Sequence, residues 1–204
     1  MLRLSKIILL FCLLTFSSFS QVIEKIDFEG NKIFNLTEYL SWGNINKGTR
    51  YYEGIVDSVK QRIIKQLSSR GYFHTNFTES GYELSPDSQK VFLKFIIHEG
   101  NPTRINSIIF DEIDSLHHVI IENIFRFFQN EIFIPAEIER SISEILSHYE
   151  NSGFPFVTVK ISSVVFFEDS VSGLPFADIL LKIIPERESR IDLIEIRGNT
   201  STKD

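Results

Sequence analysis

Apolar residues recur along the chain first at strand spacing, then at helix spacing, and then at strand spacing again. From Ile55 to Leu67 every fourth residue is apolar, which places one continuous apolar stripe on a helix. Runs rich in β-branched and aromatic residues precede and follow this helix, and such runs favour strands. We therefore expect the order β-α-α-β-β. The expected elements are a strand from Ile23, helices over 36–41 and 52–70, and strands over 72–84 and 90–98.

The same order returns in the second half of the chain. The pattern Ile-x-x-Ile-x, followed by Phe or Ile, begins at Ile23, Ile105 and Ile191, at intervals of 82 and 86 residues. Gly71-Tyr72 also returns after 82 residues, as Gly153-Phe154. Several features at one interval indicate an internal repeat. The second copy is expected to hold a strand from Ile105, helices over 116–128 and 135–152, and strands over 154–167 and 176–184.

Residues with strong capping preferences mark the helix ends. Asn35, with Glu38 three residues later, matches a capping box at the first helix. Gly71 and Gly153 stand where a glycine in the left-handed conformation ends a helix. The residues expected to face the core from the helix over 116–128 include Val119, Ile120 and Ile124.

The repeat predicts two modules and the beginning of a third, with bounds at 21–101, 102–187 and 188–204. The run Val91–Ile97 is nearly all apolar, as in a central strand, whereas the Thr-rich run Tyr72–Thr78 is typical of an edge. The expected fold class is α+β, with tandem β-α-α-β-β modules, each a three-stranded mixed sheet with two helices on one face. A lone strand cannot bury its apolar face. We therefore interpret 188–204 as an incomplete third module in a longer chain; a disordered tail, or one borrowed by a partner, is the alternative.

The first twenty residues have the features of a signal peptide. Arg3 and Lys6 precede the apolar run Ile7–Phe16, and Ser18 and Ser20 supply small residues before a cleavage point. About ten apolar residues are half of what spans a bilayer, which argues against a membrane anchor. A lipid on Cys12 is disfavoured as well, because Phe11 precedes that residue where a small side chain is needed. We expect residues 1–20 to direct export and to be cleaved.

The remaining chain is acidic and lacks cysteine. Without Arg3 and Lys6 it holds 19 basic and 27 acidic residues, a net charge of −8. Nucleic-acid binding depends on clustered Lys and Arg, so the composition argues against a nucleic-acid partner. Without disulfides in an oxidising compartment, stability depends on packed cores. The 19 Phe residues favour aromatic-rich sheets over a helical bundle.

The sequence contains no catalytic, cofactor or metal signature. It has no G-x-S-x-G motif, no phosphate-binding glycine loop, and no Cys outside residues 1–20. His117 and His118 are adjacent and do not share a helix face, so both are interpreted as a solvated helix surface. His74, His98 and His148 are expected at surfaces or strand ends. We therefore predict a protein that is not an enzyme. The aromatic run 125–128 with 132–134 is interpreted as core, part of which could dock a subunit.

The opening Ile-x-x-Ile-x pattern, the Gly followed by Tyr or Phe after the helical pair, and the junction Glu99–Ile105 together resemble POTRA, the polypeptide-transport-associated module. The resemblance covers nearly all of residues 22–199. It departs from the family at Glu112, where the first strand of the family's pattern ends in glycine. Tandem modules behind a signal peptide resemble the periplasmic arm of outer-membrane protein assembly factors. The resemblance implies either a C-terminal membrane β-barrel in a further part of the chain or a truncated or soluble relative.

A small sheet with an unpaired edge can accept an extended peptide as an added strand. With the resemblance, this predicts an exported arm on the periplasmic side of the bacterial outer membrane that binds unfolded outer-membrane protein clients by strand addition and docks periplasmic or lipoprotein accessory subunits. Pro155 and Lys160 are expected to make the second module's edge less receptive. The arm of a two-partner secretion transporter, and spacer modules of a larger exported enzyme, are the alternatives. The candidate client-binding residues are Phe73, Thr75, Phe77, Phe156, Thr158 and Lys160.

Overall fold

The computed structural model describes residues 21–111, 117–190 and 192–195. The first module holds β1 (Val22–Glu29), α2 (Leu36–Gly43), α3 (Ile55–Ser68), β2 (Asn76–Leu84) and β3 (Lys90–His98). The second module holds β4 (Arg104–Asp111), α4 (His118–Phe125), α5 (Pro135–Asn151), β5 (Thr158–Glu168) and β6 (Pro175–Ile184). The predicted signal peptide lies outside the described residues, as do Ile191 and residues 196–204 of the predicted third module. Residues 192–195 are described and do not form the predicted strand.

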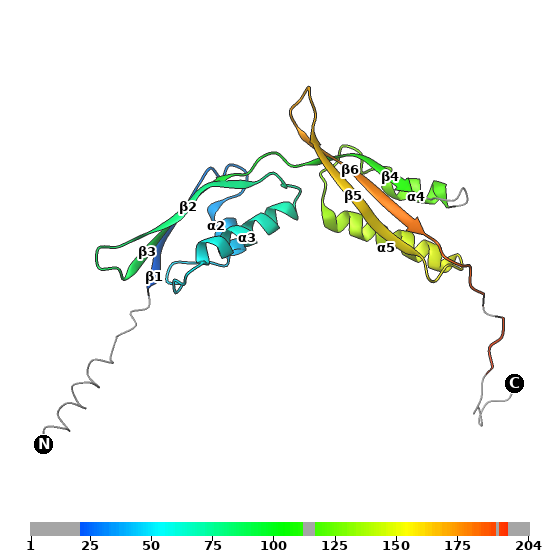
Figure 1. Cartoon of the computed structure of the whole chain (residues 1–204), viewed down its shortest axis with the longest axis horizontal. Helices are drawn as coiled ribbons and strands as arrows, with labels where there is room; N and C mark the ends of the chain where they lie inside the picture. The colour runs from blue at the N-terminus through cyan, green and yellow to red at the C-terminus, as the bar shows by residue number, and fades with distance from the viewer. Residues whose placement is uncertain (1–20, 112–116, 191, 196–204) are drawn as a thin grey trace, which may run out of the picture. The chain divides into compact units, whose positions relative to one another are not determined.

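Each module is a three-stranded mixed sheet with two helices on one face (Figure 1). The strand orders are β1-β3-β2 and β4-β6-β5. In both sheets the first strand runs parallel to the central strand and the second runs antiparallel to it. The predicted α+β fold and the central position of the apolar third strand are therefore confirmed. Side chains of β3 and β6 alternate between the core and the outer face, as the period of a strand requires.

The predicted helix signals are confirmed where the structure describes them. The Asn35 side chain accepts a hydrogen bond from the Glu38 amide, and the Glu38 carboxylate accepts one from the Asn35 amide, which completes the capping box. Gly71 and Gly153 have φ of +90° and +94°, in the left-handed region that favours glycine. The expected inward face of α4 is confirmed at Ile124, which packs against the core, and wrong at Val119 and Ile120. Ile121 and Phe125 are buried, and Val119 and Ile120 are exposed, because the apolar run on both sides of Ile121 leaves the facing residues ambiguous.

The second strand of each module begins later than predicted. β2 begins at Asn76 instead of Tyr72, and β5 at Thr158 instead of Phe154. Before β2, the Thr75 hydroxyl donates to the Glu99 carbonyl at 2.8 Å. Before β5, the Val157 amide donates to the Phe154 carbonyl in a turn, so Pro155 precedes the edge strand and does not lie in it.

Contacts divide the chain into two compact units. One contains the described residues up to Leu67 together with His74–Gly100, and the other contains Ser68–Phe73 together with the chain from Asn101 on. Within the second unit, the Gly71 carbonyl accepts a hydrogen bond from the Thr103 amide at 2.8 Å. The Phe73 ring lies 5.1 Å from the rings of both Phe133 and Phe166, measured between centroids. The segment that follows α3 is thus part of the second unit's core.

No helix within the described ranges has the length and apolarity needed to cross a membrane.

Candidate functional site

The first strand of each sheet is covered along the beginning of its outer edge. The backbone of Ile23 bonds to the amide of Gly48 and the carbonyl of Thr49, at 2.7 and 2.9 Å. At positions 82 residues later, the backbone of Ile105 bonds to the segment 130–131 in the same way, at 2.8 and 2.9 Å. The repeat therefore extends to the connections between the helices. It places a paired segment beside β1 and beside β4.

The second strand of each sheet, in contrast, has an open outer edge. In the described ranges, residues 76–84 and 158–168 make no backbone hydrogen bond apart from those of the ladder to the central strand. An edge strand of this kind presents a row of unpaired amides and carbonyls to any extended chain. β2 and β5 therefore each offer an edge at which a fourth strand can be added.

Three of the six predicted contact residues lie in these strands. Phe77 belongs to β2, and its half-buried ring faces the core with its centroid 5.9 Å from that of Phe95. Thr158 and Lys160 belong to β5 and pair with Ile184 and Lys182, on the face of the sheet away from the helices.

The other three predicted contact residues precede the strands. Phe73 packs in the second unit, and Thr75 is buried beside Glu99, so neither side chain lies at the open edge. Phe156 precedes β5 and is 69% exposed. The sequence placed these three residues in strands because it did not indicate the turns before Asn76 and Thr158.

The two open edges differ in character. β2 carries the exposed carboxylates of Glu79 and Glu83, whereas β5 carries an apolar run that ends in Phe166 and Phe167. Val165 is 55% exposed, and the side chains of Phe166 and Phe167 are also exposed. Sequence reasoning missed this apolar end of β5, although the run of four apolar residues from Val164 indicates it. The outer part of β5 is thus the more apolar of the two edges, and that of β2 the more acidic.

A buried carboxylate fixes the loop after β1. Glu99 is 4% exposed, and its carboxylate accepts hydrogen bonds from the amides of Lys32, Ile33 and Phe34 at 2.8–3.2 Å and from the Tyr39 hydroxyl at 2.6 Å. Burial alone would raise the pKa of Glu99, but the bonds from Tyr39 and the three amides outweigh it, so the pKa lies below its ordinary value. The sequence alone indicates Glu99 only as part of the junction Glu99–Ile105.

The histidines correct a second prediction. His117 is 3% exposed, and its Nδ1 lies 2.9 Å from Nε2 of His148, which is half-buried. Both rings pack against Tyr149. The interpretation of His117 and His148 as surface residues is therefore wrong, because the short α4 begins after His117 and directs that ring at α5. His118 does lie at the surface, 3.4 Å from the Glu122 carboxylate. In the described part of the chain, no three His, Cys, Asp or Glu residues form a metal-binding group.

The aromatic run after α4 divides between core and surface. Phe125 and Phe133 are buried, in agreement with the core interpretation, and Phe128 is half-buried. Phe127 is 72% exposed, and the Arg126 guanidinium stacks on its ring. The Arg126 Cζ lies 4.8 Å from the centroid of that ring. Of the Phe residues in this run, Phe127 is thus the one that lies at the surface.

The comparisons with known proteins agree with this geometry. The POTRA family model, described as a surface antigen variable number repeat, matches residues 21–100 and 103–176. The chain belongs to the POTRA family. The two matched ranges correspond to the two β-α-α-β-β modules, so the family is shown over most of the described chain.

Solved structures share the fold at low sequence identity. BamA POTRA3-5 from Haemophilus influenzae is 17% identical, with a TM-score of 0.53 over 90% of this chain and 73% of that one. The N-terminal domain of Omp85 from Thermosynechococcus elongatus is 12% identical, with a TM-score of 0.45 over 78% of this chain and 61% of that one. CdiB from Escherichia coli is 12% identical, with a TM-score of 0.38 over 82% of this chain and 28% of that one. No curated protein matches the chain in sequence.

Proposed function

We propose that this chain is the periplasmic polypeptide-binding arm of an outer-membrane protein assembly or translocation factor. It binds unfolded clients by adding them as a strand to the open edges of β5 and β2. The observation that carries the proposal is the strand order, which leaves both second strands unpaired on their outer side. Membership of the POTRA family and the similarity in fold to BamA POTRA3-5 support it.

Strand addition suits clients that share a conformation more than a sequence. Backbone amides and carbonyls supply the contacts, so an extended chain is accepted with little regard to its side chains. Each backbone hydrogen bond nets about 0.5–1.5 kcal/mol in water, and the peptide loses entropy as it is ordered. The complex is therefore weak and readily reversed, as an arm that passes a client onward requires.

The arm acts by binding and does not catalyse a reaction. In this proposal the segment 1–20 directs export, and the modules stand on the periplasmic side of the outer membrane. Accessory periplasmic or lipoprotein subunits dock on surfaces away from the open edges. One such surface is formed by the exposed Phe127 in the turn after α4.

A titration of the ¹⁵N-labelled protein tests the proposal. A ten-residue peptide that alternates Val and Thr should shift the amides of β5, including Thr158 and Lys160, and more weakly those of β2, including Phe77. We expect a Kd of about 0.1–1 mM, because few net hydrogen bonds oppose the ordering cost. Proline at alternate peptide positions should abolish the shifts, because each proline removes a donor.

A pair of matched variants locates the contact. Val165→Lys should weaken binding to β5 about fivefold, since it removes apolar contact area on the edge strand. Val171→Lys lies in the β5–β6 connection and is the control, with affinity unchanged. Shifts that gather on helix residues such as Lys60 and Gln66 would show that clients dock on the helical face and that strand addition is wrong.

A further inference from the structure

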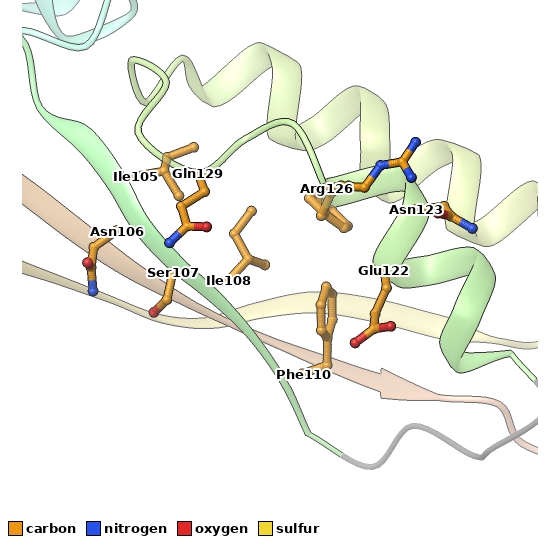
Figure 2. Close-up of a pocket in the computed structure, with 10 residues that line it drawn as sticks. Ile105, Asn106, Ser107, Ile108, Phe110, Glu122, Asn123, Arg126 and Gln129 are labelled. Carbon is orange, nitrogen blue, oxygen red and sulfur yellow. The ribbon is translucent and has the colours of Figure 1, made fainter.

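The second module has a groove beside β4, on the opposite edge of the sheet from β5. It encloses about 500 Å³ between β4, α4 and the segment after α4. Figure 2 shows the Phe110 ring pointing from β4 toward α4, Ile108 pointing into the space between them, and Gln129 reaching back toward Ser107. The floor of the groove is apolar and its rim carries the amides of Asn106, Asn123 and Gln129, which suits an extended chain.

The backbone of β4 offers hydrogen bonds to this groove. Both backbone groups of Ile105 point away from β6, because they bond to the segment 130–131. Ile105, Ile108 and Phe110 pair with alternate residues of β6, so all three share that orientation. The last bond between the covering segment and β4 runs from the Asn130 amide to the Ile105 carbonyl. Beyond it, within the described residues, the outward groups of Ile108 and Phe110 bond to no other backbone.

The first module provides an internal comparison at the same positions. There the Lys47 ammonium lies 2.7 Å from the Glu24 carboxylate, and this ion pair joins the segment after α2 to β1. Eighty-two residues later the pair is replaced by Gln129 and Asn106. The Asn106 side chain turns away and donates to Asp178 at 2.7 Å. The ion pair that links the two walls in the first module is thus absent from the second.

The groove also contains one cation. Arg126 is the only basic residue in its lining. Its guanidinium stacks on the ring of Phe127. It forms no salt bridge with any residue that the structure describes. Glu122, the one acidic residue of the lining, lies 3.4 Å from His118. The unpaired positive charge therefore favours an acidic group on the ligand.

We infer that this groove binds an extended peptide as a strand on β4, with alternate apolar side chains against Ile108 and Phe110 and an acidic side chain at Arg126. The inference takes only the ligand class, an extended polypeptide, from the proposed function. It gives the second module a second binding edge, so that one module can hold two extended segments on opposite sides of its sheet. The first module differs at the equivalent position, where the side chains of Lys47 and Glu24 form an ion pair.

Two peptides test the inference against the ¹⁵N-labelled protein. One alternates Val and Thr with a central Glu, and the other has Lys in place of that Glu. The Glu peptide should shift the amides of Ile108 and Phe110 and the side-chain amide of Gln129. It should bind at this edge about threefold more tightly than the Lys peptide, as expected of a partly exposed ion pair. Arg126→Gln should remove the difference.

Exchange of matched residues between the modules provides the control. Asn106→Glu with Gln129→Lys installs the first module's ion pair and should weaken binding at β4 at least about tenfold. Glu24→Asn with Lys47→Gln alters the first module at the matched positions and should leave the β4 affinity unchanged. On the peptide, N-methylation of the alternate residues that face β4 should abolish the shifts, and N-methylation of the intervening residues should preserve them.

The outcomes separate this inference from the proposed function. Shifts at β5 with none at Ile108 and Phe110 would overturn the inference and leave the proposed function intact. An unchanged β4 affinity in the Asn106→Glu/Gln129→Lys protein would overturn it as well. If the double variant loses the peptide-induced amide shifts at β4 but keeps those at β5, the result would support a second and independent binding edge.

Discussion

Replacement of Glu99 by Gln should lower the free energy of unfolding of the first module by about 3 kcal/mol at pH 7. The amide of Gln carries no charge and presents an NH₂ group to donors that need an acceptor. At least one of the four hydrogen bonds from Lys32, Ile33, Phe34 and Tyr39 is then lost in a buried site, and the others weaken. Trp42, the only tryptophan, lies in α2 beside Phe34, so its fluorescence during urea unfolding reports on this module.

The same variant should change how stability depends on pH. The pKa of Glu99 is lower in the folded state than its ordinary value of 4.5. Its carboxylate therefore contributes stability that is fully present above the unfolded pKa and is lost as pH falls through the folded pKa. Between about pH 5 and pH 3, the unfolding midpoint of the wild type should fall more steeply than that of Glu99→Gln.

An exposed carboxylate supplies the control for Glu99. Glu83 lies on the outer face of β2, and Glu83→Gln should leave both the midpoint and its pH dependence close to those of the wild type. If Glu99→Gln followed the wild-type curve from pH 7 to pH 3, the carboxylate would not hold the loop after β1.

Gly30→Ala should destabilise the first module by about 3–5 kcal/mol, the sum of backbone strain and steric overlap. Gly30 has φ of +85°, which L side chains rarely adopt, and a Cβ there would lie 2.1 Å from the Ile97 carbonyl oxygen. The obstacle is backbone of the central strand β3, which cannot move aside without breaking its ladder. The measurement is again the urea midpoint followed through Trp42.

Gly54 separates the two causes. It has φ of +86°, but a Cβ there would have no neighbour within 4 Å. Gly54→Ala should therefore cost only about 1 kcal/mol, from the left-handed conformation alone. Equal losses at Gly30 and Gly54 would show that the close approach of Gly30 to the Ile97 backbone does not affect stability.

Most of the fold follows from local sequence, because its main signals are local. The apolar run Val91–Ile97 identified the central strand, and Asn35 with Glu38 identified the start of α2. The repeat interval of 82 residues then carried the first module's elements onto the second. Errors arose where long-range contacts decide the structure. Nothing local indicates that Thr75 bonds to Glu99, or that Phe73 packs with Phe166, yet these contacts delay the start of β2.

The candidate site was predictable as an edge but not as a set of side chains. The polar composition of residues 72–78 placed the second strand at the rim of the sheet, and the strand order confirms that. Which residues of the strand reach the edge depends on the turn before it, which the sequence did not indicate. The pairing of His117 with His148 joins residues 31 apart, and the Glu99 site joins residues 60 to 67 apart. Spacing rules within one helix do not detect contacts of this range.

The central claim is that an extended polypeptide adds to the outer edge of β5 as a fourth strand. The most direct measurement is the set of nuclear Overhauser effects between the ¹³C-labelled protein and an unlabelled peptide that alternates Val and Thr. The account predicts cross-strand contacts between backbone protons, repeated every two residues along Thr158–Glu168, on the side away from β6. Contacts confined to side chains of α5 and α4, with none to the backbone of β5 at saturating peptide, would contradict it.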